Sequence, residues 1–110
     1  MGKKWVIQDR YGNTIYLTHE RWQHIVNPSG HPEMEDYSDH LKETIRTGRR
    51  QQEPLDPRKY RYVKHFEDLV GNNNHIVAIV IFKLGVDEKG NTIENNFVLT
   101  AYQKYMKLKR

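Results

Sequence analysis

Three histidines stand close together at positions 19, 24 and 31, in the segment LTHERWQHIVNPSGHPEME. Imidazole is the side chain whose charge changes most readily near neutral pH, so it is suited to transferring protons. It has only an intermediate preference for protein interiors, and packing alone does not account for the cluster. The segment is therefore a candidate for acid–base chemistry.

His24 is the leading candidate for a base or an acid. A helix is expected over residues 19–27, and His24 lies three residues after Arg21 on the same edge of it, while Trp22 and Ile25 face inward. Arg21 would then help to bind the substrate. An alternative of equal weight is a partly exposed helix histidine that only hydrogen-bonds the following loop.

His31 is the second candidate, at the expected start of another helix. The helix dipole there favours anions and a neutral imidazole, so His31 could act as a base or donate to a phosphate. In a GHPE sequence, however, a histidine more often caps the helix or stabilises the loop. His19, beside Glu20 in a first helical turn, is more typical of a solvated surface ring.

The histidines do not have the spacing of a metal site. They lack the i to i+4 pairing of a zinc-binding helix, and no HExxH or paired-carboxylate pattern accompanies them. The HFED segment at 65–68 offers a histidine and two carboxylates, but such sets usually form polar turns. A metal-free site is favoured, and neither a metal nor a cofactor is expected.

The segment KYRYVKHF alternates cations with rings. Since strand side chains point alternately to two faces, positions 59, 61, 63 and 65 would share one face and positions 60, 62, 64 and 66 the other. Arg61 could clamp a phosphate with its planar guanidinium, Tyr62 could stack on a base, and Lys64 adds a cation. The same residues are also common on edge strands, where they discourage aggregation.

Thr100 and Tyr102 are expected on one face of the final strand, in LTAYQKYMKLKR. Their hydroxyl groups are donors that can stabilise the charge of a phosphorane. Lys104 adds a cation for substrate binding near the end of the same strand. A Thr-Ala-Tyr triplet can equally belong to an ordinary sheet.

Two helices and about five strands must position these residues. A Gly-Asn turn at 12–13 between alternating segments predicts an opening hairpin. Thr18 should cap the first helix, over residues 19–27, and the second helix is expected over 32–47, ended by Gly48.

The rest of the chain should supply three strands, KYRYVKHF, HIVAIVIFKL and NNFVLTAYQKYM, as an antiparallel meander. The middle segment is apolar almost throughout, which is typical of a central strand with both faces covered. The predicted fold class is α+β, with the two helices packed through Trp22, Ile25, Leu41 and Ile45 on an antiparallel sheet made of the hairpin and the meander.

Composition limits the class of protein. The 110 residues suit a single domain over 1–110, and 36% hydrophobic and 29% charged residues with 2 Trp, 7 Tyr and 3 Phe indicate a polar but folded chain. The net charge of +4 favours polyanionic partners without singling them out. The chain has no cysteine, which excludes disulfides and thiolate metal clusters. It has no apolar run near the roughly 20 residues that span a bilayer and no signal-peptide core, so a cytoplasmic location without membrane contact is expected.

The order of these motifs resembles the phage-associated branch of the barnase, EndoU, colicin and RelE-like (BECR) nuclease superfamily. The resemblance covers roughly residues 15–105 and depends on LTHERWQHI, HPEM, YRYVKHF, IVAIVIFK and FVLTAYQKY in this order. Its specific parts are His24-Ile25, His31-Pro32-Glu33 and Thr100-Ala101-Tyr102. The resemblance implies a metal-independent RNA endonuclease, toxin-like or phage-related, with an antitoxin or immunity protein as a partner beside RNA.

Two classes of function follow. The leading hypothesis is an endoribonuclease in which His24 and His31 transfer protons while Arg61, Thr100 and Tyr102 surround the phosphate. RNA would be bound by Arg21, Tyr62, Lys64 and Lys104. The alternative is a non-catalytic RNA-binding or protein-interaction module of the same fold, and a poorer third hypothesis is a structural phage protein. Only the enzyme would release a product.

Overall fold

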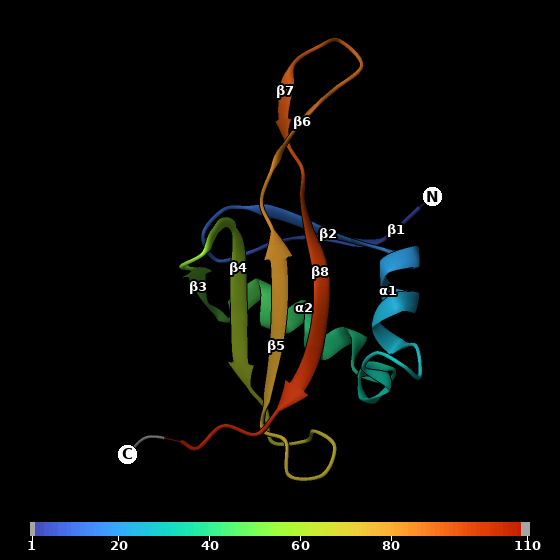
Figure 1. Cartoon of the computed structure of the whole chain (residues 1–110), viewed down its shortest axis with the longest axis vertical. Coiled ribbons are helices and arrows are strands. Elements are labelled where there is room, and N and C mark those ends of the chain that lie inside the picture. The colour runs from blue at the N-terminus through green and yellow to red at the C-terminus, as the bar shows by residue number, and fades with distance from the viewer. Residues whose placement is uncertain (1, 109–110) are drawn as a thin grey trace.

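Six strands form one mixed sheet in the order β1-β2-β8-β5-β4-β3, and two more form a separate hairpin, β6-β7 (Figure 1). The computed structural model describes residues 2–108. The helices are α1 (His19–Val26), the short 3-10 helix η1 (Pro32–Met34) and α2 (Ser38–Thr47). The strands are β1 (Lys3–Gln8), β2 (Thr14–Thr18), β3 (Arg49–Glu53), β4 (Asp56–His65), β5 (His75–Ile81), β6 (Leu84–Val86), β7 (Thr92–Glu94) and β8 (Asn96–Lys104). The predicted α+β class, with helices packed on the sheet, is confirmed.

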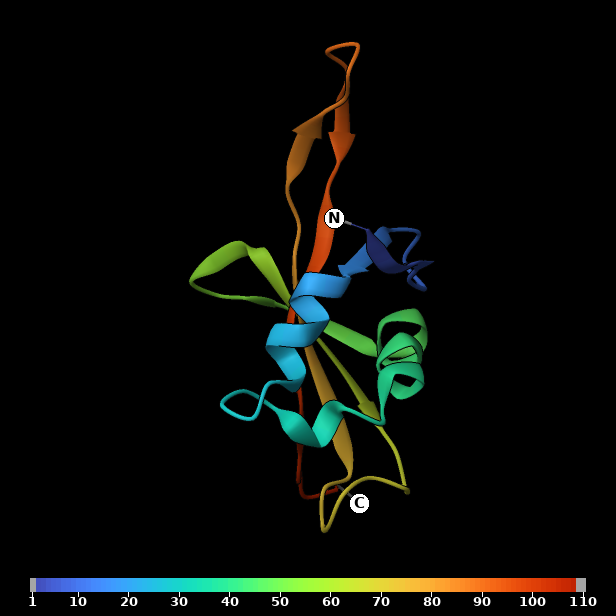
Figure 2. The ribbon, with the colours of Figure 1, turned by 90° about the vertical axis from the view of Figure 1, so that its right-hand side faces the viewer.

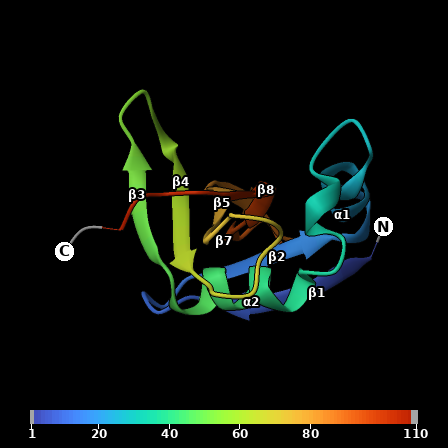
Figure 3. The same cartoon turned by 90° about the horizontal axis from the view of Figure 1, so that it is seen from below.

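Helix α2 packs on β4 and β5 and also contacts β1, while α1 lies along β8 (Figures 1 and 2). The core between the helices and the sheet contains Ile15, Leu17, Trp22, Ile25, Met34, Leu41, Ile45, Tyr62, Ile76, Val80 and Val98. Seen from below, α2 lies on one side of β4, β5 and β8, and the β3–β4 hairpin and the loop after α1 stand at opposite ends of the other side (Figure 3). We call this other side the open face.

The first hairpin and the start of α1 form as the sequence predicts. The Asp9 carboxylate accepts the N–H groups of Tyr11 at 2.9 Å and Asn13 at 2.8 Å, and Gly12 has φ 86°, a conformation that costs glycine little. The Thr18 hydroxyl oxygen accepts the N–H of Arg21 at 3.0 Å and so caps α1. The hairpin therefore leads directly into the first helix.

The second helix differs from its prediction, because residues 32–47 form η1 and α2 with a break between them. Tyr37 precedes α2 with φ −119° and ψ 28°, outside the helical region. The break lets Met34 enter the core, while the Tyr37 hydroxyl donates to the carbonyl of Asp68 at 3.2 Å. Gly48 ends α2 as predicted: a Cβ there would lie 2.3 Å from the Thr44 carbonyl oxygen.

The antiparallel meander β4-β5-β8 is present, but the rest of the sheet corrects the prediction. Strand β8 also pairs in parallel with β2, through Ile15 with Asn96 and Tyr16 with Phe97. Residues 49–53, expected in a polar connection, form β3 and pair with β4. The connection expected between the last two strands contains the β6-β7 hairpin. The sheet is thus mixed and larger than predicted.

The register of β4, β5 and β8 arranges the open face in rows, three of which carry the candidate residues. Paired residues lie opposite one another and share a face of the sheet. These three rows are Arg61–Ile79–Thr100, Val63–Val77–Tyr102 and His65–His75–Lys104. Neighbouring strands are about 4.8 Å apart, so each row spans roughly 10 Å between outer Cα atoms. The predicted alternation of faces along β4 is confirmed, with Tyr62 buried on the helix side.

Candidate functional site

His31 lies beside the last strand, against Tyr102. The two ring centroids are 5.3 Å apart. The loop after α1 brings His31 there: its N–H donates to the carbonyl of Ile25 at 2.7 Å, and Gly30 makes a close turn in which a Cβ would lie 2.8 Å from the carbonyl oxygen of His24. The side chain of His31 remains partly exposed. An imidazole is therefore placed at the edge of the open face.

Glu33 connects the His31 ring to strand β8. Its carboxylate lies 3.5 Å from Nδ1 of His31 and accepts the N–H of Gln103 at 3.4 Å. The buried Gln103 amide in turn donates to the carbonyl of Glu33 at 3.0 Å. A carboxylate beside one imidazole nitrogen fixes the orientation of the ring. The His-Pro-Glu triplet thus places both the imidazole and the group that orients it.

A cavity of about 370 Å³ lies between the tip of the β3–β4 hairpin and the open face. It is lined by Glu53, Leu55, Asp56, Lys59, Arg61, Ile79, Leu99 and Thr100. The guanidinium of Arg61 forms an ion pair with the Glu53 carboxylate at 2.8 Å. Arg61 and Thr100, two of the residues predicted to surround a phosphate, therefore line one cavity.

Glu53 was not identified from the sequence. It lies on β3, and reaches Arg61 diagonally because Gln51 is the residue directly opposite Arg61. The only sequence signal was the proline-flanked segment QQEPLDP, which would have predicted Glu53 on this face if read as a hairpin. Asp56, on the same rim, accepts hydrogen bonds from the backbone and then the side chain of Arg58, which lower the pKa of its carboxyl group.

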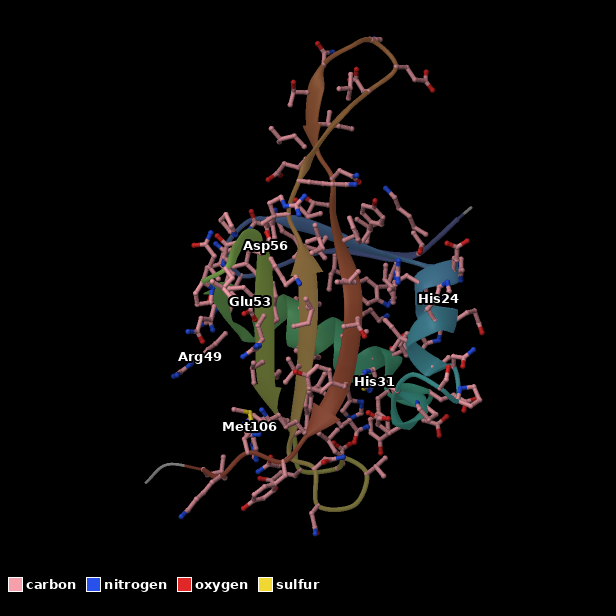
Figure 4. The ribbon with its side chains drawn as sticks, viewed as in Figure 1. His24, His31, Arg49, Glu53, Asp56 and Met106 are labelled. Atoms are coloured by element: carbon pink, nitrogen blue, oxygen red, sulfur yellow. The ribbon has the colours of Figure 1, made fainter. Side chains whose placement is uncertain are left out.

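His24 and Arg21 lie apart from this group. The side chain of His24 is exposed on α1, and within residues 2–108 no hydrogen bond, ion pair or ring contact involves it. Figure 4 shows His24 on α1 and His31 beside β8. Arg21 lines a smaller cavity of about 190 Å³, together with Lys83 and Phe97 near the start of β8. The structure therefore does not bring the two predicted proton-transfer histidines into contact.

Tyr62 does not reach the open face. Its ring is fully buried, and its hydroxyl donates to the Asp9 carboxylate. Burial and the neighbouring Asp9 raise the pKa of the phenol, so Tyr62 is neutral and acts as a donor. No ring surface is left to stack on a base, which corrects the predicted role in substrate binding.

Lys64 and Lys104 differ in position. Lys64 projects from β4 on the opposite side to Arg61, with Nζ 6.0 Å from the ring centre of Phe66. It therefore lies on the other face from Arg61, as the predicted alternation along this strand places it. Lys104 is exposed and pairs with His75 in the third row of the open face. Of the predicted substrate-binding residues, Lys104 is thus the one placed on that face.

Among the described residues, no group of three or more His, Asp or Glu side chains is placed to hold a metal ion. In the same part of the chain, no helix has the length and apolar character to cross a membrane. Comparison of the chain with protein-family models, with curated proteins and with solved structures gives no match.

Proposed function

We propose that this chain is a metal-independent RNA endonuclease whose active site is the open face of the sheet. The supporting observation is the placement of His31 against Tyr102, on the same face as Thr100 and the Arg61–Glu53 pair. These side chains supply an imidazole, two hydroxyl donors, a guanidinium and a carboxylate. Proton transfer and stabilisation of phosphorane charge need these groups and no metal.

The reaction begins with removal of the proton from a ribose 2′-hydroxyl. The 2′-oxygen attacks the adjacent phosphorus, the bond from phosphorus to the 5′-oxygen breaks, and an acid donates a proton to that oxygen. Arg61, Thr100 and Tyr102 would bind the non-bridging oxygens as their charge rises. The products carry a 2′,3′-cyclic phosphate and a 5′-hydroxyl.

The attacking and leaving oxygens lie on opposite sides of the phosphorus, so the base and the acid should approach from opposite sides. Glu53 and His31 lie toward opposite edges of the open face: Glu53 on the side of the β3–β4 hairpin and His31 on the side of β8 (Figure 4). We therefore assign the two proton transfers to His31 and Glu53. The proton-transfer role predicted for His24 remains a prediction. Mutation distinguishes it from the assignment to Glu53.

Three single variants distinguish these assignments. His31→Ala and Glu53→Gln should each lower the RNA cleavage rate by about 100-fold or more, the usual contribution of a general acid or base. The exposed His24 is the matched control, and His24→Ala should change the rate by less than about threefold, within what loss of a surface side chain costs. Loss of activity in His24→Ala with full activity in Glu53→Gln would instead favour the pair of histidines. Circular dichroism would establish that each variant is folded.

The alternative function is RNA binding without cleavage. The packed rings of His31 and Tyr102 favour it, because a partly exposed aromatic pair can stack on a base without taking part in a reaction. Both functions predict RNA binding, and only the enzyme gives shortened RNA. The toxin-like or phage-related role in the cytoplasm, with an antitoxin or immunity protein as partner, belongs to the proposal through the sequence resemblance alone.

A further inference from the structure

A second cavity, of about 450 Å³, lies at the edge of the sheet where β3 begins. Arg49, the first residue of β3, pairs with Val63, so Lys64 and His65 lie beyond the last pair of these strands. The cavity is lined by Arg10, Thr47, Gly48, Arg49, Val63, Lys64, His65 and His75. It shares no lining residue with the cavity that contains Arg61 and Thr100.

The lining of this edge cavity is entirely basic or neutral. Arg10, Arg49 and Lys64 come from three different segments, and no aspartate or glutamate of the described residues lines the cavity. Within residues 2–108, none of these three cations has a carboxylate within 4.0 Å, whereas Arg46, Arg58 and Arg61 each form an ion pair. Like charges gathered at one place repel one another, and an anion bound among them removes that repulsion.

Two histidines add protonatable rings to the same cavity. The rings of His65 and His75 are 5.3 Å apart, and His75 Nδ1 lies 2.7 Å from the Asn74 side-chain oxygen. Burial, and then the charge of His65, lower the pKa of His75. Two charged groups beside this pair are Lys104, opposite His75 on β8, and the exposed Glu67, 3.7 Å from Nε2 of His65. The one carboxylate beside the pair among the described residues, that of Glu67, is largely exposed to solvent, where its charge is screened.

The walls of the cavity are held in place by the fold. Arg10 follows the first strand, and its guanidinium donates to the carbonyl of Thr47 at 3.3 Å, at the end of α2. Gly48 lies so close to the carbonyl oxygens of Thr44 and Val63 that a Cβ would be 2.3 and 2.9 Å from them. Only glycine therefore fits at this position of the cavity wall.

We propose that this edge cavity is a binding site for a phosphate group, with Arg49 as its principal ligand and Arg10, Lys64, His65 and His75 around it. The planar guanidinium of Arg49 suits bidentate contact with phosphate oxygens. The phosphate belongs either to a nucleic-acid strand that continues from the third row of the open face, or to a free phosphate. The site goes beyond the proposed function, because it needs no cleavage.

The test measures binding of two probes by isothermal titration calorimetry: inorganic phosphate and a single-stranded DNA decanucleotide, which lacks the 2′-hydroxyl required for cleavage. Arg49→Gln should weaken binding of at least one probe by about tenfold or more, the loss expected for a charge-assisted contact. The matched control is Arg46→Gln, which removes the same charge three residues earlier, at an arginine bound to Glu43 and outside the cavity. It should change the affinity by less than about threefold.

The source of the phosphate is identified by whether Arg49→Gln weakens binding of both probes or of the decanucleotide alone. Weakened binding of both probes supports a general phosphate site, and weakened binding of the decanucleotide alone supports a subsite for the nucleic-acid backbone. Equal weakening by Arg49→Gln and Arg46→Gln would show that net charge alone binds the probes, and would overturn the proposal. Absence of binding by the native chain would also overturn it, and RNA cleavage by the same sample would show that the proposed function survives.

Discussion

His31 is held by two contacts that come from different parts of the chain. Its ring packs against Tyr102 of β8, and its Nδ1 lies 3.5 Å from the Glu33 carboxylate. Glu33 is itself bound to Gln103, next to Tyr102. The position of the imidazole is therefore coupled to the end of β8, where Thr100 and Tyr102 meet the open face.

Glu33→Gln tests this coupling. The variant removes the carboxylate beside His31 but can keep the backbone contact with Gln103, so the protein should fold normally. A misplaced catalytic ring should lower the cleavage rate by about 10-fold to 100-fold and change its pH profile. The control is Glu35→Gln at a neighbouring exposed residue, for which the rate and the profile should be unchanged. A Glu33→Gln enzyme with native kinetics would show that His31 does not depend on Glu33.

Asp9 and Tyr62 form a buried polar pair with a structural role. Asp9 is 5% exposed, and burial alone would raise the pKa of its carboxyl group, but hydrogen bonds from Tyr62, Asn13 and Tyr11 together lower it. Tyr62→Phe removes the first of these donors and leaves the carboxylate under-satisfied. The free energy of unfolding at pH 7 should fall by about 1–3 kcal/mol, as measured with urea.

The Asp9–Tyr62 pair also predicts how the loss of stability in Tyr62→Phe depends on pH. The folded pKa of Asp9 is lower than its ordinary value of 3.8, so its ionised form stabilises the fold fully above pH 3.8. This contribution disappears as the pH falls through the lower folded value. The gap in unfolding free energy between native protein and Tyr62→Phe should therefore narrow below about pH 4. A gap that stays constant down to pH 2 would assign the loss to packing of the ring.

Two hairpin turns of the protein use the same residues in the same geometry. Asp9 to Asn13 and Asp87 to Asn91 share the pattern Asp-x-x-Gly-Asn, with the aspartate side chain accepting two backbone N–H groups in each. Gly12 and Gly90 both have φ 86°. The first turn joins strands of the main sheet, while the second closes β6-β7, which stands away from it (Figure 1).

Identical glycine substitutions should therefore have different effects. Gly12→Ala places a Cβ in the left-handed region and should lower the free energy of unfolding by about 1–2 kcal/mol. Gly90→Ala has the same local cost, but β6-β7 can open without unfolding the sheet, so the global value should change by less than about 0.5 kcal/mol. Urea unfolding of both variants measures the difference. Equal losses would mean that the outer hairpin belongs to the cooperative unit.

Helix α2 contributes to the fold mainly through its buried residues. Leu41 has no exposed surface, so Leu41→Ala should lower the free energy of unfolding by about 2–5 kcal/mol in thermal or urea unfolding. Lys42→Ala, at the next residue, removes only an exposed ion pair with Asp39 and should cost less than about 1 kcal/mol. Similar losses in both variants would contradict the assignment of the buried side of α2.

Local patterns predicted the elements whose signals lie within a few residues. The Thr18 cap, the Gly48 stop and the apolar run of β5 all gave correct elements, because capping and alternation depend on neighbours in the chain. The parallel pairing of β2 with β8 joins residues about eighty positions apart and has no local signal. Strand β3 was missed because RRQQE has no apolar alternation.

For the candidate site as well, the residues placed by local sequence patterns were predictable and those placed by long-range contacts were not. Arg61, Thr100 and Tyr102 share a face because strand alternation is a local property. Glu53 was missed together with β3, since its contact with Arg61 exists only once that hairpin forms. Tyr62 was misplaced because alternation defines two faces but does not say which of them the helices cover.

The whole molecule carries a net charge of +4, and the open face presents Lys59, Arg61 and Lys104. Cations that bind phosphates release counterions from the nucleic acid, so affinity for single-stranded RNA should fall as salt rises. Three or four such contacts predict a slope of about −2 to −3 for the logarithm of the binding constant against the logarithm of salt concentration. Fluorescence anisotropy with catalytically inactive His31→Ala protein measures it. A flat dependence would show that the charged groups do not bind the backbone.

Cleavage at a single ribonucleotide tests the proposed active site most directly. The purified protein is incubated in EDTA, between pH 6 and 8, with an end-labelled RNA and with the same RNA carrying 2′-deoxyribose at the cleaved position. We expect cleavage of the first substrate to a 2′,3′-cyclic phosphate and no cleavage of the second at that position, because the attacking hydroxyl is absent. Cleavage of the deoxy position, activity that requires added magnesium, or intact RNA throughout this pH range would contradict a metal-independent endonuclease on the open face.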